Sequence, residues 1–202
     1  MKAKLFPFIC TILLSFGAIA QEEQQEVVSN SYKQIGVSVT TTLNNPTKVS
    51  PFSYFGIGGY YTIIDNLAFE GIAGMGSWGY YGALSLLYFI PEQENLFIKG
   101  TCMRSGGGKE KNLSTMGYSK YADTQINLFP IINANLTVGR VVDIYKSLSF
   151  SAEIGYAYRF GDIEDKYRIL ESNTVFDEDS KNIVSKMAPG GFIFSLGLTY
   201  NL

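Results

Sequence analysis

Four charged residues occupy positions where side-chain chemistry is possible: Glu70, Lys99, Glu153 and Arg159. Each lies in a segment that alternates large apolar with small or polar residues, and each falls in the small or polar set. Two neighbouring carboxylates can act as general acid and general base, so Glu70 and Glu153 form one candidate active site. Charges enclosed in a narrow interior must instead be paired or hydrated. Because two basic residues accompany the two acids, we predict a structural ion-pair network and keep the paired-carboxylate site as the alternative.

The composition removes most catalytic chemistry. The chain has no histidine, which excludes Ser-His-Asp and Cys-His catalysis and most zinc sites. The glycine-rich stretches 56–59 and 106–108 do not lie between a strand and a helix, so they are not phosphate loops. The acidic run 177–182 lacks the glycine and the bidentate glutamate of a calcium loop, and we predict a solvated loop there. We therefore predict no catalytic residue, no metal ligand, no cofactor and no enzymatic activity. The net charge of −2 also argues against a nucleic-acid partner.

The elements that must position these charges are β-strands. In residues 192–202 every even-numbered residue is large and apolar, and most odd-numbered residues are small or polar. This two-residue period is that of a strand with one apolar and one polar face. Segment 80–90 is apolar on both faces, so its orientation stays unassigned. The eight predicted strands are residues 34–43, 52–64, 67–76, 80–90, 96–104, 131–142, 147–160 and 192–202.

The connections between these strands alternate in length. Connections two, four and six are short turns near residues 65, 91 and 143, whereas connections five and seven are the long breaks 105–130 and 161–190. Short turns on one side and longer loops on the other are typical of transmembrane barrels with an even number of strands. We predict an all-β, eight-stranded antiparallel up-and-down transmembrane β-barrel. The rival fold, a soluble barrel or sandwich, would crowd its large apolar side chains into a narrow interior.

The amino-terminal residues predict export. Two lysines, an apolar run and the small-x-small site Ala18-Ile19-Ala20 are typical of a cleaved signal peptide over residues 1–20. Residues 21–33 are polar and acidic, and we predict a flexible periplasmic leader there. The barrel domain is then 34–202. It contains a single cysteine, Cys102, so no disulfide framework is expected.

The architecture over residues 34–202 resembles small bacterial outer-membrane proteins of the OmpA transmembrane-domain and OmpX type. The most specific motif is the terminal pattern polar-x-Gly-x-x-aromatic-x-hydrophobic, which Ser195, Gly197, Tyr200 and Leu202 match in order, although an aromatic residue is commoner at the last position. The resemblance implies that the barrel-assembly machinery recognises these residues. The tyrosine-rich chain also resembles outer-membrane β-barrel domain proteins of the Bacteroidetes group. The expected location is therefore the outer membrane of a Gram-negative cell envelope, with the lipid bilayer as a partner.

Three function hypotheses remain open on the sequence. The leading one is a structural or interaction protein whose outer loops, 105–130 and 161–190, meet the environment or an extracellular partner. The second is a narrow porin-like channel for ions or solutes, which an eight-stranded barrel disfavours because its own side chains fill it. The third is a lipid-modifying enzyme, which would need a mechanism without histidine. The sequence does not identify a ligand, a partner or an oligomeric state.

Overall fold

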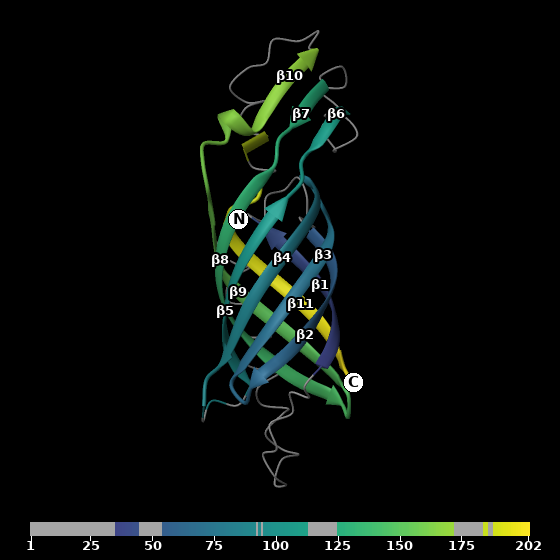
Figure 1. Cartoon of the computed structure of the whole chain (residues 1–202), viewed down its shortest axis with the longest axis vertical. Helices are drawn as coiled ribbons and strands as arrows, with labels where there is room; N and C mark the ends of the chain where they lie inside the picture. The colour runs from purple at the N-terminus through teal and green to yellow at the C-terminus, as the bar shows by residue number, and fades with distance from the viewer. Residues whose placement is uncertain are drawn as a thin grey trace, which may run out of the picture. The chain divides into compact units, whose positions relative to one another are not determined.

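Eight strands close into an antiparallel barrel in the computed structural model (Figure 1). The structure describes residues 35–44, 54–91, 93, 95–112, 125–171, 184–185 and 188–202. The barrel strands are β1 Ile35–Asn44, β2 Tyr54–Ile64, β3 Leu67–Gly76, β4 Gly79–Phe89, β5 Leu96–Ser105, β8 Ile131–Tyr145, β9 Leu148–Arg159 and β11 Gly191–Asn201. Each of the eight predicted segments is one of these strands, and the predicted all-β up-and-down barrel is confirmed as a fold. The predicted signal peptide 1–20 and leader 21–33 lie outside the described residues.

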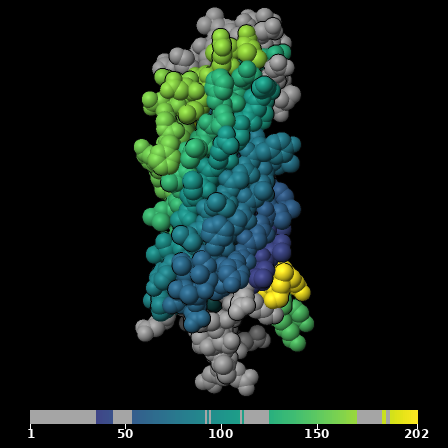
Figure 2. Space-filling model, viewed as in Figure 1, coloured from purple at the N-terminus to yellow at the C-terminus, as the bar shows by residue number. Residues whose placement is uncertain are grey.

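The first and last strands of the barrel close it. β1 pairs with both β2 and β11, so that Val39 faces Ile57 on one side and Leu198 on the other. Since every barrel strand has two neighbours, the barrel itself presents no strand edge. Strands β2 to β5 form a continuous wall on the face turned to the viewer in Figure 2. Within the described part of the chain, no helix is long and apolar enough to span a membrane.

The two ends of the barrel differ in their connections. We call the end with the β2–β3, β4–β5 and β8–β9 connections the turn end, and the opposite one the loop end. The predicted turn at 143–146 is wrong in its bounds, because β8 continues to Tyr145 and the turn lies at residues 146–147. A register shift between Asp143 and Tyr145 accommodates the longer strand, and Ser149 Oγ donates a hydrogen bond of 2.7 Å to Asp143 Oδ1 beside it. Asp143 therefore belongs to the β8–β9 ladder, where it pairs with Ser149, and not to the turn.

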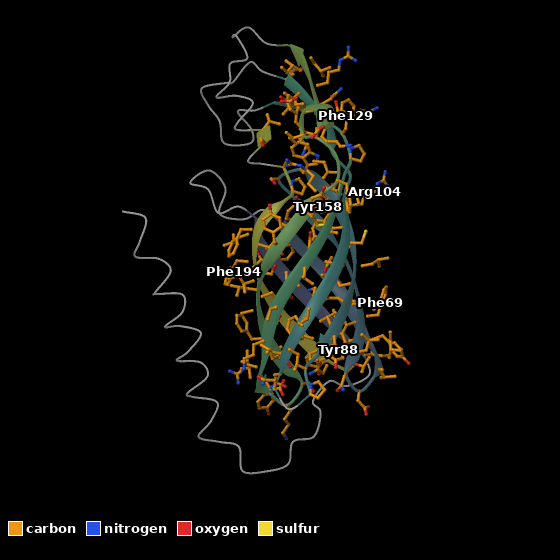
Figure 3. All side chains as sticks on the ribbon, turned by 90° about the vertical axis from the view of Figure 1, so that its left-hand side faces the viewer. Phe69, Tyr88, Arg104, Phe129, Tyr158 and Phe194 are labelled. Carbon is orange, nitrogen blue, oxygen red and sulfur yellow. The ribbon has the colours of Figure 1, made fainter. Side chains whose placement is uncertain are left out.

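The barrel wall is apolar outside and mixed inside. Outward side chains such as Ile57, Leu84 and Leu136 are more than half exposed, and Figure 3 shows Phe69 and Phe194 pointing away from the barrel. The small and polar set of each predicted strand faces inward, as with Ser38 and Thr137. The ambiguous strand β4 also obeys the two-residue period. Its buried inward residues are Tyr81, Ala83, Ser85 and Leu87.

The long breaks contain a second, smaller sheet that the sequence did not predict. It consists of β6 Gly108–Asn112, β7 Gln125–Leu128 and β10 Tyr167–Glu171, in the order β10-β7-β6, with the short 3₁₀ helix η3 Glu164–Lys166 before β10. Gly107, with φ of +75°, supplies the left-handed backbone conformation between β5 and β6. The interpretation of 105–130 and 161–190 as breaks without strands is therefore corrected. These strands have four or five residues, which is too short for a period to be recognised.

Candidate functional site

The barrel interior is layered along its axis. Near the turn end, five buried side chains form an apolar layer: Tyr60, Ala68, Leu87, Phe97 and Val141. One step further along the strands lie the charged residues of β3, β5 and β9. Nearer the loop end, a second apolar layer contains Tyr54, Tyr81, Ala83 and Met103. The interior is therefore filled by side chains, with charge enclosed between two layers rich in aromatic residues.

Lys99 connects two carboxylates across the interior. Its Nζ lies 2.8 Å from Glu70 Oε2 and 2.9 Å from Glu153 Oε1, and all three side chains are less than a tenth exposed. A hydroxyl group donates a hydrogen bond to the other oxygen of each carboxylate: Ser38 Oγ donates to Glu70 Oε1 at 3.1 Å, and Thr137 Oγ1 donates to Glu153 Oε2 at 3.0 Å. We call Glu70, Lys99 and Glu153 the lumen triplet. Its geometry is that of a cross-link between three strands, because the lysine separates the carboxylates and is held by both of them.

Arg159, the fourth predicted member of this network, lies elsewhere. It is six residues beyond Glu153 on β9, about 20 Å along the strand at ~3.3 Å per residue. It lines an open groove of about 530 Å³ at the loop end together with Asp162 and Glu164. The structure thus brings together three of the four predicted charges, and among the described residues the ion pairs of Lys99 are with Glu70 and Glu153, not with groups near Arg159. The two-residue period predicts which face of the strand a side chain occupies, but not its height along the barrel. The sequence therefore placed all four charged residues in one network.

Inward aromatic side chains were missed by the sequence analysis. Three of them lie against an inward glycine of another strand: a Cβ on Gly36 would collide with the Tyr60 ring, one on Gly56 with Tyr81, and one on Gly139 with Phe97. The glycine therefore makes room for the ring. Large and small residues thus alternate across the narrow interior. The signal in the sequence was the set of tyrosines and phenylalanines that fall on the polar face, such as Tyr54 and Phe97.

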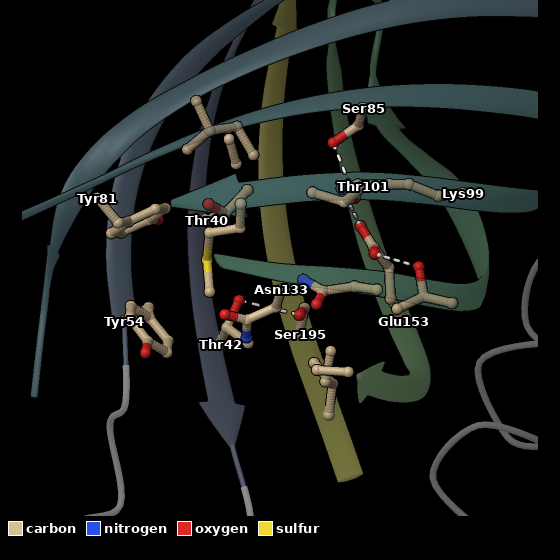
Figure 4. A pocket seen from close by; sticks show the side chains of 17 residues that line it. Thr40, Thr42, Tyr54, Tyr81, Ser85, Lys99, Thr101, Asn133, Glu153 and Ser195 are labelled. Carbon is tan, nitrogen blue, oxygen red and sulfur yellow. Dashed lines mark hydrogen bonds and ion pairs between the residues drawn. The ribbon is translucent and has the colours of Figure 1, made fainter. Parts of the chain in front are cut away.

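A cavity of about 60 Å³ lies in the loop-end half of the interior (Figure 4). Tyr54 and Tyr81 lie on one side of this view, and Lys99 and Glu153 lie on the other. Its lining mixes hydroxyl and amide side chains with apolar ones such as Met103, and Thr42 and Ser195 share a hydrogen bond of 3.0 Å across the β1–β11 seam. Asn133 also lines the cavity and is fully buried, yet neither of its amide atoms has a hydrogen-bond partner among the described residues.

The small sheet covers its own apolar core, which we call the Trp78 cluster. Its buried members are Trp78, Ile126, Leu128, Ile131, Val184 and Ala188. Trp78 belongs to the β3–β4 connection, is fully buried, and donates from Nε1 to the carbonyl oxygen of Phe129 at 2.8 Å. Burial, with the negative charge of Glu164, raises the pKa of Tyr167 in β10. The cluster ties the small sheet to the barrel rim, because Ile131 begins β8.

The predicted assembly residues all lie on β11 or directly after it. Ser195 and Gly197 face the interior, where Ser195 pairs with Thr42. Tyr200 and Leu202 face outward and are more than half exposed. These positions join β11 to β1, since Tyr200 faces Val37 and Leu202 N–H donates to the carbonyl oxygen of Ile35. The motif therefore coincides with the seam at which the barrel closes.

Comparison with known proteins does not assign the chain to a family. No protein-family model matches the chain, and the search of curated proteins finds no match. Among the described residues, no group of three or more histidine, cysteine, aspartate or glutamate side chains is arranged to hold a metal ion. The acidic run 177–182 and residues 113–124 of the first long break lie outside the described residues.

Proposed function

We propose that this chain is an outer-membrane β-barrel with a filled interior, acting as a structural or interaction protein through its loop end. The observation that carries the proposal is the inversion of the barrel wall. Soluble proteins rarely expose large continuous apolar patches. Here large apolar side chains are exposed on the outside of all eight barrel strands, while hydroxyl, amide and charged groups such as those of Ser38, Asn133 and Lys99 are buried inside. An apolar exterior around a polar interior is the arrangement that a lipid bilayer selects.

Aromatic residues on the outer wall support the same proposal. Outward tyrosines gather near the turn end, at Tyr61, Tyr88, Tyr145 and Tyr200, and near the loop end, at Tyr80, Tyr156 and Tyr158. Between them the exposed wall is largely aliphatic, as at Ile57, Leu84 and Leu136. Tyr80 and Tyr88 on β4 lie about 26 Å apart along the strand, or about 20 Å along the barrel axis for strands tilted by ~40°. Two aromatic belts at such a spacing fit the interfaces of a bilayer.

Heat-modifiability of the protein in purified outer membranes tests the location. We expect the folded barrel to migrate differently before and after boiling, and external protease to cut only within 105–130 and 161–190. A protein recovered in the soluble periplasmic fraction with no shift on boiling would refute the membrane proposal. The proposed sidedness places the turn end of the barrel in the periplasm. Cleavage of the turn end by protease added to intact cells would refute it.

The narrow channel remains the second candidate, because the cavity and the lumen triplet give the interior a polar path. The apolar layers at Phe97 and Met103 argue against a continuous pore. Planar bilayer recordings separate the two: an interaction protein gives no steady openings. Steady openings of the unsubstituted protein would favour the channel. The lipid-modifying enzyme is the weakest candidate, and an unchanged lipid profile after gene deletion would remove it.

The assembly role of the terminal motif has its own test. We expect Tyr200→Ala to lower the assembled, heat-modifiable fraction, because this outward residue completes the motif on the closing strand. Tyr156→Ala removes an equally exposed outward tyrosine from β9 and serves as the matched control. Equal assembly of both variants would contradict recognition of Tyr200 by the barrel-assembly machinery.

A further inference from the structure

The described interior holds two carboxylates for one ammonium group. Glu70 and Glu153 both contact Lys99, and Arg159 lies about 20 Å further along β9. With both carboxylates ionised, the lumen triplet carries one uncompensated negative charge. A buried net charge is costly unless another charge or water offsets it. The interior therefore favours a positive species beside the triplet.

The cavity beside the triplet offers oxygen atoms without partners. Glu153 and Lys99 form part of its lining, and so do Asn133 and Asn135. The Oδ1 atoms of both asparagines are buried and have no hydrogen-bond partner within the described residues, and the same holds for Nδ2 of Asn133. Buried amide groups are nearly always satisfied by protein or ordered solvent. These atoms therefore point to something that occupies the cavity.

We propose that this cavity binds a small monovalent cation, of the sodium or potassium kind, together with one or two water molecules. Neutral amide and hydroxyl oxygens are suitable ligands for such an ion, and the excess carboxylate supplies the attractive field. Divalent ions usually bind directly to at least one carboxylate, and here both carboxylates are already held by Lys99. The volume of about 60 Å³ accommodates an ion with little water. This inference needs only the closed barrel and is independent of the membrane location.

Rubidium locates the site directly, because its anomalous scattering distinguishes it from water. Crystals of the purified full chain grown in rubidium chloride should show an anomalous peak inside the cavity, at coordinating distance from Asn133 Oδ1. Ordered water in the cavity without an anomalous peak would overturn the proposal. A peak confined to the protein surface would overturn it as well.

Thermal unfolding in matched salts tests the site in solution. At equal ionic strength, potassium chloride should raise the unfolding midpoint above that in N-methylglucamine chloride, saturating with concentration, because a ligand that binds only the folded state stabilises it. Glu153→Gln removes the charge excess and should abolish the difference between the salts. Asn133→Leu should abolish it through the loss of the amide oxygen. Asp143→Asn removes an exposed carboxylate at the turn end and should leave the difference unchanged.

Identical midpoints of the unsubstituted protein in the two salts would overturn the proposal without any variant. A difference that survives in Glu153→Gln would also overturn it, since the attraction would then come from elsewhere. If Asn133→Leu does not fold, the salt comparison on the unsubstituted protein and on Glu153→Gln still decides the question.

Discussion

The barrel interior and the Trp78 cluster hold themselves together by different means. In the barrel, strand pairing closes the structure, and the enclosed side chains are joined by ion pairs and hydrogen bonds such as those of Lys99. In the Trp78 cluster, β7 and β10 pack on an apolar core around one buried indole, and β6 joins the sheet by pairing with β7. The barrel therefore depends on strand pairing and on its enclosed ion pairs and hydrogen bonds, whereas the small sheet depends on hydrophobic burial.

The largest effect is expected from Lys99→Met. The substitution leaves two buried carboxylates facing each other without a cation, which costs about 3–5 kcal/mol of unfolding free energy. Urea unfolding of the folded barrel measures this loss. Lys109→Met, on an exposed residue of β6, is the control and should change stability by less than about 0.5 kcal/mol. Equal effects of the two substitutions would mean that the lumen triplet does not stabilise the barrel.

An outward charge should cost somewhat less and should reveal the surroundings of the barrel. Leu136 is 63% exposed near the middle of β8, and Leu136→Arg should destabilise a lipid-embedded barrel by about 2–4 kcal/mol. The free energy of unfolding from lipid vesicles measures the loss. Arginine on a water-exposed wall would change stability by less than about 0.5 kcal/mol. That smaller result would contradict a bilayer around the wall.

The hydrogen bond at the closing seam should contribute less. Thr42→Val removes the hydroxyl that pairs with Ser195, for an expected loss of about 0.5–1.5 kcal/mol. Unfolding of Thr42→Val, Ser195→Ala and the double variant forms a double-mutant cycle. Strictly additive losses would show that the two hydroxyls do not stabilise each other.

The smallest effect on the barrel is expected from Trp78→Ala. Deleting a fully buried indole opens the apolar core of the small sheet, but the eight-strand ladder stays intact. Hydrogen exchange should therefore accelerate in β7 and β10, with little change at the centre of β4 or β9. Faster exchange throughout the barrel would contradict the separation of the two regions.

Residues of the barrel were predictable because closure enforces one side-chain period over ten residues or more. This period placed Glu70, Lys99 and Glu153 on the inner face and set the eight strands. It failed for β4, where both faces are apolar because Tyr81 and Leu87 fill the interior. The small sheet was not predictable, since its core combines residues from four distant connections and strands, including Trp78 and Val184. Only tertiary contact, and no local pattern, joins these residues.

Pairing between β1 and β11 sets a condition on how the molecule can be made. Gly36 finds its partner Asn201 only after nearly the whole chain has been synthesised. Until then one edge of β1 has no partner strand, so the barrel cannot close while the chain is still being synthesised. Loss of β11 through an early stop codon would leave an open sheet in which β1 and β9 each have an unpaired edge, and unpaired strand edges promote aggregation. The barrel wall is therefore complete only when the last strand has paired with the first.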